Sequence, residues 1–495
     1  MAREHGEQAA LIAWIALAAI TALRLIVAAA SPMSPDEAYY WVWSRALAAG
    51  YLDHPPMVAL FIRVGATLLG EGDLGVRLLS PLAAALGTLM LAQTGRYLFP
   101  GRQAGLWAAV LLNATLLFAA GATTMTPDTP LLLFWSATLW ALARLYATER
   151  GVWWLVAGVA AGLAMASKYT AALLGPAILV WLVWSPEMRR WLRSPMPYLA
   201  ALLAVLVFSP VLEWNAAHGW VSLLKQGGRV GDWSPARAAQ FVAELIGGQI
   251  GLATPPIALL GGAGLAIALR RARRGDAAWT LLAATSAIPA AIFLEHALGD
   301  RVQANWPAIV YPSALLAAAA GLSERWRRWF APSALFGLAL SLLVWTQATL
   351  APLALPMLWD PTLLRLGGWA ELAQQIDAEA TRQNAEFIVD DNYGQAALLA
   401  RLLPKGRVVI GLDPRWSLFD LPRPNASIEG RLGLLVRTAR RSDTPEDPAW
   451  SVIERLGALI RARNGMVAEE FRLYRVTASG QTRGLAVMPR PKDLP

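Results

Sequence analysis

The chain has 495 residues, of which 56% are hydrophobic and only 16% are charged. Soluble globular domains are about 25% charged, so this composition indicates a membrane protein. The formal net charge of +9 does not indicate nucleic-acid binding, because many of the arginines stand in short loops between apolar runs. The chain has no cysteine, which excludes disulfides, thiolate catalysis and cysteine metal sites.

A transmembrane helix needs about 20 mostly apolar residues, and some are as short as about 17. The first apolar run ends in Val27 to Ser31, which resembles a signal-peptide cleavage site, but its length favours an uncleaved anchor. The stretch 152–185 allows a broken or re-entrant element as an alternative to two spans. The sequence predicts eleven spans, at 9–30, 76–98, 104–121, 130–147, 152–167, 170–185, 197–212, 247–269, 277–294, 306–321 and 332–350.

Arginines are concentrated in alternate loops of this predicted bundle. Cytoplasmic loops carry the excess of lysine and arginine, so the arginine-rich side is predicted to be cytoplasmic. The other loops, and the tail from about residue 351, are then predicted to lie outside the cytoplasm. The fourteen arginines that set this orientation are Arg96, Arg102, Arg144, Arg150, Arg189, Arg190, Arg193, Arg270, Arg271, Arg273, Arg274, Arg325, Arg327 and Arg328.

Residues with catalytic or binding potential gather in the loops on the outer side. Ionisable side chains near membrane depth are costly, and they usually line a cavity or face one another. Each also has a structural alternative: Asp36 and Asp128 stand where a carboxylate caps a helix, Lys168 can extend to the membrane interface, and loop histidines are commonly solvated. The candidates are Asp36, Glu37, Asp53, His54, Asp128, Lys168, Tyr169, His218, His296, Arg301 and Asn305.

The segment 57–70 is apolar but too short to span a bilayer. It belongs to a large first outer loop, 31–75. We expect an amphipathic helix in the outer interface there, in preference to a loop packed on the bundle.

The tail becomes polar from about residue 365 and alternates strand-like and helix-like patterns. We therefore expect a transmembrane catalytic domain over 1–355 and a small extracytoplasmic α/β domain over 356–495. The predicted strands are 386–390, 407–410, 434–436 and 471–476, with a helix over 395–403. Asp390, Asp391 and Tyr393 follow the first strand, where open sheets bind ligands, but a plain strand-end turn is the favoured interpretation.

Several motifs occur in the same order, and on the same predicted side, as in a known family. The Asp36-Glu37 pair with the aromatic run behind it, the Asp53–Pro56 element and the Thr126–Pro130 turn resemble the GT-C glycosyltransferases. The nearest groups are the protein O-mannosyltransferases (glycosyltransferase family 39) and the lipid A aminoarabinose transferases. The resemblance covers about 30–310, and more weakly the tail. It implies a polytopic α-helical GT-C fold of about 11–13 transmembrane helices and a sugar donor carried on a polyprenyl phosphate.

The resemblance also implies roles for individual residues. Asp36, with Glu37 beside it, matches the family's catalytic acidic position, and Asp128 matches a further active-site carboxylate. Lys168 falls where the family has a basic residue that meets the donor phosphate. Asp53-His54 stand where the aminoarabinose transferases have Glu-Lys, which places them near the acceptor or a metal. The other candidates are Tyr169 and Arg301 at the donor phosphate, and His218, His296 and Asn305 near the acceptor or a metal.

The chemistry of glycosyl transfer requires a similar set of groups. A hydroxyl acceptor becomes nucleophilic when a carboxylate takes its proton. Negative charge then builds on the departing phosphate, and Lys168 and Arg301 are candidates to stabilise it. A divalent metal held by Asp53 with His296 or His218 is an alternative, although the spacing specifies no metal.

The leading hypothesis is an inverting glycosyltransferase of a bacterial inner membrane, with its site and tail in the periplasm. It would move a sugar from a polyprenyl phosphate to an envelope lipid or glycan of the lipid A or lipopolysaccharide type, with no nucleic-acid partner. A protein O-glycosyltransferase is the alternative, but the small tail favours a lipid acceptor. A lipid-linked sugar transporter or flippase is disfavoured, because the sequence shows no related halves and mid-span charges are nearly absent apart from Lys168.

Overall fold

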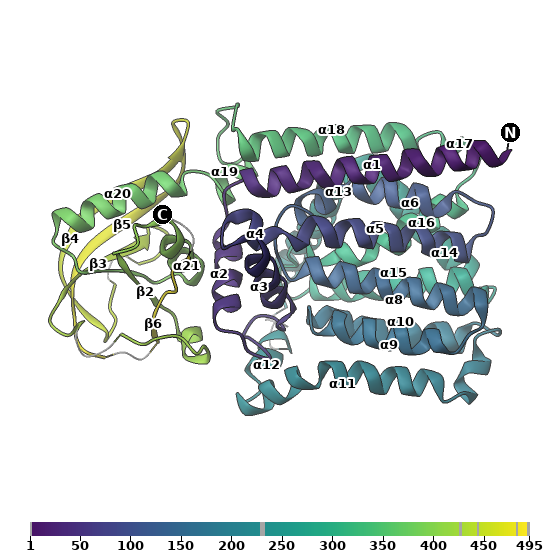
Figure 1. Cartoon of the computed structure of the whole chain (residues 1–495), viewed down its shortest axis with the longest axis horizontal. Helices are drawn as coiled ribbons and strands as arrows, with labels where there is room; N and C mark the ends of the chain where they lie inside the picture. Colours follow the sequence, from purple (N-terminus) through teal and green to yellow (C-terminus); the bar gives the residue numbers. More distant parts are fainter. Residues whose placement is uncertain (1, 228–232, 425–427, 443–444, 482–483, 493–495) are drawn as a thin grey trace. The chain divides into compact units, whose positions relative to one another are not determined.

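The structure is a computed structural model that describes residues 2–227, 233–424, 428–442, 445–481 and 484–492 (Figure 1). The chain divides into two compact units, each built from stretches far apart in sequence. The first unit contains Met1–Arg24, Ala49–Val58 and Leu79–Leu342, and the second contains Leu25–Ala48, Ala59–Leu78 and Leu343–Pro495.

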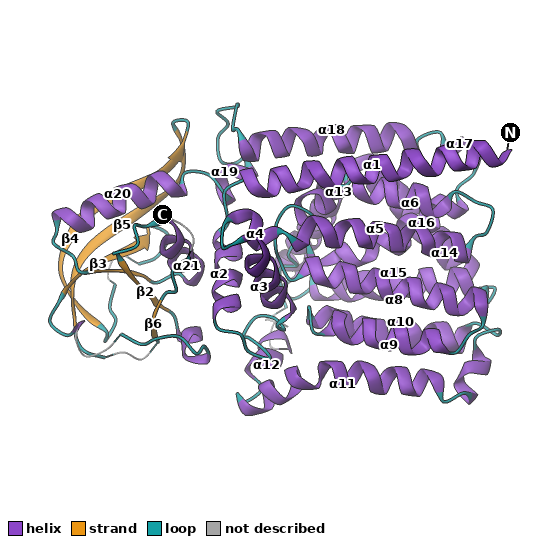
Figure 2. Ribbon diagram, in the orientation of Figure 1, coloured by secondary structure: helices purple, strands orange, loops and turns teal. Residues whose placement is uncertain are grey.

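The described part of the first unit is built of helices, with 3₁₀ turns between some of them (Figure 2). Helices α5, α8, α9 and α11 pack side by side in that order. Helices α1 and α18 begin and end in different units. The bounds are α1 Ala2–Ala30, α5 Leu79–Leu98, α6 Ala104–Asn113, α7 Leu116–Gly121, α8 Asp128–Thr148, α9 Val152–Met165, η1 Tyr169–Leu173, α10 Leu174–Trp184, η2 Arg189–Arg193, α11 Met196–Ala217, α12 Val221–Gly227, α13 Pro235–Ala253, α14 Pro255–Ala272, α15 Ala277–His296, η3 Trp306–Val310, α16 Tyr311–Gly321, α17 Glu324–Arg327 and α18 Phe330–Thr349.

Six helices of the described chain are long and apolar enough to cross a membrane, and a bent pair brings the number to at most seven. Five shorter apolar helices accompany them, including 57–69, where the sequence predicted a helix. Each of the eleven predicted segments contains helix, although some are interrupted, as at Ala114–Thr115 between α6 and α7. The chain is therefore a multi-pass helical membrane protein, as predicted.

The prediction of one continuous span over 247–269 is wrong at its start. Helix α13 ends at Ala253 and α14 begins at Pro255, with an angle of 110° between them. Proline lacks a backbone N–H and disfavours the helical conformation in the residue before it. Thr254 accordingly takes φ 69° and ψ 144°, and the Pro255-Pro256 pair sets the direction of the new helix.

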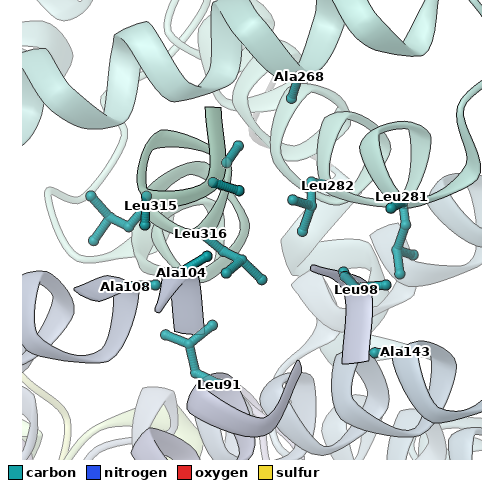
Figure 3. Packing of buried hydrophobic residues seen from close by; sticks show 14 of the residues in the cluster. Leu91, Leu98, Ala104, Ala108, Ala143, Ala268, Leu281, Leu282, Leu315 and Leu316 are labelled. Carbon is teal, nitrogen blue, oxygen red and sulfur yellow. The ribbon is translucent and has the colours of Figure 1, made fainter. Parts of the chain in front are cut away.

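Small residues bring helices of the first unit into backbone contact. A Cβ on Gly95 of α5 would lie 2.3 Å from the Cα of Gly105 in α6, and one on Gly158 of α9 would lie 2.3 Å from the carbonyl oxygen of Ala200 in α11. Helices associate in lipid through such close packing. Lipid tails are as apolar as the side chains, so the hydrophobic effect does not drive the helices together. Figure 3 shows buried leucine side chains of the same unit from α5, α15 and α16, among them Leu91, Leu282 and Leu316.

The second unit combines the first loop with the C-terminal part of the chain. Its α2 begins with a capping box, in which Ser34 accepts from the Glu37 N–H and the Glu37 carboxylate accepts from the Ser34 N–H. The apolar α3 is a helix, as predicted for 57–70. The helices are α2 Pro35–Arg45, α3 Met57–Leu69, α4 Asp73–Arg77, α19 Pro361–Arg365, α20 Trp369–Arg382, α21 Tyr393–Leu402 and η4 Pro414–Leu418.

A six-stranded sheet forms the centre of the C-terminal region, in the order β4-β5-β3-β1-β2-β6. The buried β1 is parallel to β2 and β3, and the outer pairs are antiparallel. This confirms the small α/β domain. The sequence predicted β1, β2, β3 and β5, but it missed β4, β6 and α20. The strands are β1 Phe387–Asp390, β2 Val408–Leu412, β3 Leu432–Thr438, β4 Trp450–Arg463, β5 Met466–Ala478 and β6 Leu485–Val487.

Candidate active site

A buried ion pair in the first unit joins two of the predicted site residues. Lys168 leaves α9 in an extended conformation, and its Nζ donates to Asp128 Oδ1 at 2.7 Å. Asp128 is the first residue of α8, where the free N–H groups of the helix favour a negative charge. Both side chains are nearly inaccessible to solvent. The pair is therefore held in place by α8 on one side and by the end of α9 on the other.

Asn305 completes this group. Its Nδ2 donates to Asp128 Oδ2, so each oxygen of the carboxylate accepts from a different side chain. The ring of Trp306 lies 5.9 Å from the Lys168 ammonium, within the range of a cation–π contact. The structure thus brings together Asp128, Lys168 and Asn305, which stand far apart in the sequence.

The Asp53 loop is fixed by a helix that the sequence did not single out. Lys225 of α12 forms an ion pair with the Asp53 carboxylate, and Gln226 donates to the Asp53 carbonyl oxygen at 3.0 Å. Ser222 of the same helix donates to the Leu52 carbonyl oxygen. His54 lies in this loop, and its carbonyl oxygen accepts from the Tyr51 N–H at 3.2 Å.

Tyr169 and His218 both interact with residues of α11. The buried Asn215 donates from Nδ2 to the Tyr169 hydroxyl at 3.3 Å, at the start of η1. The His218 ring stacks on Trp214, with 4.2 Å between the ring centroids. His218 Nδ1 also lies 2.7 Å from the Trp214 carbonyl oxygen. His218 therefore packs against its own helix.

Arg301 and His296 interact with partners other than Lys168 and Asp128. Arg301 makes a two-point ion pair with Glu244 of α13, with 2.9 Å between Nη2 and Oε1, and both side chains are solvent-exposed. The His296 ring packs against Trp306, with 5.6 Å between the ring centroids. Arg301 would have to leave Glu244 before its guanidinium could bind a phosphate.

In the second unit, Asp36 and Glu37 point into different environments. The Asp36 side chain is 53% exposed, and one carboxylate oxygen lies 4.0 Å from Arg365 Nη1. Asp36 stands in the first turn of α2, near the positive end of the helix dipole. Its exposure leaves the carboxylate accessible to a substrate.

Glu37 is fully buried and holds the start of α2. Arg77 donates from Nε and Nη2 to the two Glu37 oxygens, at 2.7 and 2.8 Å. The remaining Arg77 donor, Nη1, binds the carbonyl oxygens of Ala28 and Ser31. The Glu37 carboxylate is thus used for structure, whereas the sequence assigned it with Asp36 to catalysis.

Lys225 and Arg77 were not predicted from the sequence. They pair with the candidate residues Asp53 and Glu37. One signal for Lys225 was available, because the chain contains only four lysines, at 168, 225, 405 and 492. Both lysines of the N-terminal 355 residues pair with carboxylates of the predicted site, Asp128 and Asp53. Rare lysines in this arginine-rich chain therefore marked positions that pair with carboxylates of the candidate site.

Comparison with known proteins relates this arrangement to glycosyl transfer. The sequence profile of the dolichyl-phosphate-mannose-protein mannosyltransferase family matches residues 53–214, a range that contains Asp53, Asp128 and Lys168. The lipid A galacturonosyltransferase RgtD of Rhizobium johnstonii is 28% identical over 73% of this chain and 76% of that protein. The undecaprenyl phosphate-α-4-amino-4-deoxy-L-arabinose arabinosyl transferase 1 of Sodalis glossinidius is 32% identical over 36% of this chain, and the match spans only 34% of its own length.

The fold agrees with a solved structure over nearly the whole chain. ArnT from Cupriavidus metallidurans, solved with bound undecaprenyl phosphate, superimposes with a TM-score of 0.63 at 16% identity, covering 93% of this chain and 97% of that one. This chain has the GT-C fold. The GT-C fold and the enzyme class predicted from the sequence are both confirmed.

The glycosyltransferase offers no fitting metal site among the residues predicted to hold one. Asp53 pairs with Lys225, and His218 Nδ1 faces a carbonyl oxygen of its own helix. Within the described residues, no group of three or more His, Asp or Glu side chains is placed to hold a metal ion. The sequence-based expectation of a metal held by Asp53 and His296 therefore does not fit the structure.

Proposed function

We propose that this glycosyltransferase moves a sugar from a polyprenyl phosphate to an envelope lipid or glycan of the lipid A type. Two observations support the donor and the acceptor. The arabinosyl transferases are named for an undecaprenyl-phosphate sugar, and ArnT was solved with undecaprenyl phosphate. The relative RgtD, which matches 73% of this chain, is named for transfer to lipid A.

The buried Lys168–Asp128 pair is the observation that carries the proposal. An ammonium has three N–H donors, and Asp128 accepts one of them, so the others are available to a phosphate. Asp128 and Asn305 hold the Lys168 side chain in one orientation, which lowers the entropy that donor binding must remove. In a site that excludes water, such a fixed cation stabilises the charge that develops on a leaving phosphate.

The reaction that we propose is a single displacement. The acceptor hydroxyl attacks the anomeric carbon as the bond from that carbon to the phosphate oxygen breaks, and the phosphate leaves with the bonding electrons. Asp36 takes the hydroxyl proton, because its exposed carboxylate at the start of α2 is accessible. Lys168 stabilises the departing polyprenyl phosphate. The sugar is transferred with inversion of configuration.

The cellular setting belongs to the same proposal. Arginine-rich loops on one side support a cytoplasmic location for that side, and hence a periplasmic location for Asp36, Lys168 and the C-terminal domain of a bacterial inner-membrane enzyme. We assign catalysis to residues 1–355, and we expect residues 356–495 to contribute to acceptor handling.

A transfer assay tests the proposed function. Purified protein in lipid nanodiscs is given undecaprenyl-phosphate aminoarabinose or a polyprenyl-phosphate galacturonic acid, together with a lipid A extract. We expect a lipid whose mass rises by one sugar residue with one of these donors. Both Asp36→Asn and Lys168→Met should lower the rate, by about 100-fold or more.

Arg190→Gln serves as a control, because Arg190 is an exposed residue of a predicted cytoplasmic loop and should not affect transfer. Sugar transfer to a protein substrate, with no change in any lipid, would replace the lipid acceptor by a protein. Donor movement across the bilayer without any sugar transfer would overturn the proposal.

A further inference from the structure

The C-terminal domain contains a cavity of about 760 Å³ that the proposed reaction does not use. Cavities of about 300–1,000 Å³ are typical of small-molecule sites. The walls combine carboxylates, guanidinium groups, an amide and a hydroxyl with an apolar side that includes Leu412, Pro414 and Trp450. An adjoining cavity of about 690 Å³ shares Trp450 and the segment 445–448 with it.

The cavity stands at the part of the sheet where α/β proteins usually bind ligands. The chain leaves β1 toward β2 on one side, whereas β3 lies on the other side of β1. Connections therefore diverge at the carboxyl ends of β1 and β3, which is the position of ligand sites in open parallel sheets. Asp391 follows β1 and Arg437 lies in β3, and both line the cavity.

The net negative charge of the cavity lining disfavours an anionic ligand. Asp391 Oδ2 already pairs with Arg437 at 2.8 Å and with Arg441 at 2.9 Å. The other lining carboxylates include Glu446 and Asp447, and neither has an ion-pair partner in the described part of the chain. Carboxylates thus outnumber guanidinium groups, so a phosphate or a carboxylate ligand would meet net repulsion.

The buried polar atoms of the cavity call for a ligand that both donates and accepts hydrogen bonds, because Asp391 Oδ1 lacks a donor and Arg437 Nη1 lacks an acceptor among the described residues. Asp391 is 6% exposed, and its Oδ1 is buried without a hydrogen bond from any described residue. A buried acceptor left without a donor is unfavourable by about 1–3 kcal/mol. Hydroxyl and ammonium groups supply such donors, while the Gln481 amide and the Ser417 hydroxyl can bind the remaining ligand oxygens.

We propose that this cavity is a second saccharide site, separate from the reacting groups, for a sugar that is uncharged or carries an amine. Polar walls match the sugar hydroxyl groups, and the apolar wall around Trp450 matches a face of C–H groups. The assignment of this sugar to the acceptor rests on the proposed function. The binding of a sugar in the cavity does not.

The binding test uses the full chain in nanodiscs, with glucosamine as the probe and saturation-transfer difference NMR as the readout. Wild type should transfer saturation to glucosamine, and Glu446→Gln should weaken binding by about tenfold, as expected for the loss of one charged hydrogen-bond partner. Asp391→Asn/Glu446→Gln should abolish it. Glu386→Gln, an exposed carboxylate outside the cavity that pairs with Arg431, is the matched control and should bind as wild type does.

Lys168→Met tests whether glucosamine binds at the reacting groups instead of in the cavity. This variant should retain glucosamine binding. Equal binding by wild type and Glu446→Gln, or no binding by wild type, would overturn the saccharide site. Preferential binding of inorganic phosphate would overturn its ligand class. The acceptor assignment is tested by kinetics: Glu446→Gln should raise the KM for the acceptor and leave the KM for the donor unchanged. An unchanged acceptor KM despite weakened glucosamine binding would contradict only the acceptor assignment.

Discussion

At the scale of single residues, Lys168 has two roles that mutation can separate. Its ammonium neutralises Asp128 in a buried position, and we propose that it also meets the donor phosphate. Removal of one member of a buried ion pair leaves the other charge uncompensated, which is more damaging than removal of both. Stability and transfer should therefore respond differently to single and double substitutions.

Lys168→Met is expected to lower the free energy of unfolding by about 3–5 kcal/mol, because Asp128 remains buried without its cation. Lys168→Met/Asp128→Asn should recover most of that stability but no transfer activity. Thermal unfolding in nanodiscs and the transfer assay measure the two effects. A double variant that regains transfer would show that Lys168 serves the fold alone.

Arg24 presents the opposite case, a buried cation without an acceptor. It is fully buried in α1, none of its three guanidinium nitrogens donates a hydrogen bond to a described residue, and the Phe118 ring lies 5.4 Å from it. Replacement of a poorly paired buried charge by an apolar side chain is often stabilising, by about 1–4 kcal/mol.

Arg24→Met should therefore raise the unfolding midpoint without loss of transfer. Arg77→Met is the matched comparison, because Arg77 is equally buried but donates to Glu37 and to backbone carbonyl oxygens, and its loss should lower the midpoint. Loss of transfer by a folded Arg24→Met would contradict a purely structural position for Arg24.

At the scale of elements, α2 carries two adjacent acids with different surroundings. Asp36 is exposed, whereas Glu37 is enclosed by Arg77 and by the Ser34 cap. Asp36→Asn should reduce transfer by about 100-fold with no change in unfolding midpoint. Glu37→Gln should lower the midpoint, because it leaves the buried Arg77 without its counter-ion.

Thermal unfolding and the transfer assay, applied to both variants, compare the neighbours directly. If Glu37→Gln kept its unfolding midpoint and lost only activity, Glu37 would have to be counted among the reacting groups, as the sequence suggested.

Elements that depend on local signals were predictable from the sequence, and two available signals were overlooked. Asn464-Gly465 takes positive φ at both residues and turns β4 into β5, and this dipeptide is a strong hairpin signal. Pro255-Pro256 likewise marked the break before α14. The Glu37–Arg77 pair was not predictable, because its members are 40 residues apart and local patterns do not report such contacts.

At the scale of the whole molecule, the C-terminal domain should respond to pH through Asp390. Burial, and the charge of Asp391 beside it, raise the pKa of Asp390 well above its ordinary 3.8. The folded protein then keeps a proton that the unfolded chain has lost. Stability should therefore fall as pH rises from about 3.8 and level off above the folded pKa.

Asp390→Asn has no such proton to lose, so its unfolding midpoint should fall less between about pH 4 and pH 7 than that of wild type. Asp420→Asn replaces an exposed carboxylate of the same unit and should follow wild type. Scanning calorimetry across this pH range measures the difference. Parallel curves for wild type and Asp390→Asn would show that the buried carboxyl keeps its ordinary pKa.

The membrane class, the α/β tail and the pairing of acids with cations could be predicted from composition and motifs. The partners within the site could not, because Lys225 and Glu244 reach Asp53 and Arg301 from α12 and α13, elements whose positions depend on the packing of the first unit. Sequence order placed Asp128, Lys168 and Asn305 on one side of the membrane, but only the fold joins them at one carboxylate.

The composition of the second unit has a consequence for synthesis of the protein. Its first loop emerges from the ribosome early, yet Arg401 binds the Glu71 carbonyl oxygen across 330 residues, and Tyr39 packs on Tyr393 with 4.5 Å between ring centroids. Contacts of such high sequence separation form late. The packing of α2 therefore stays incomplete, with Tyr39 and Trp41 uncovered, until the last quarter of the chain has been translated. Chains that end before Tyr393 would leave these aromatic side chains without their C-terminal partners.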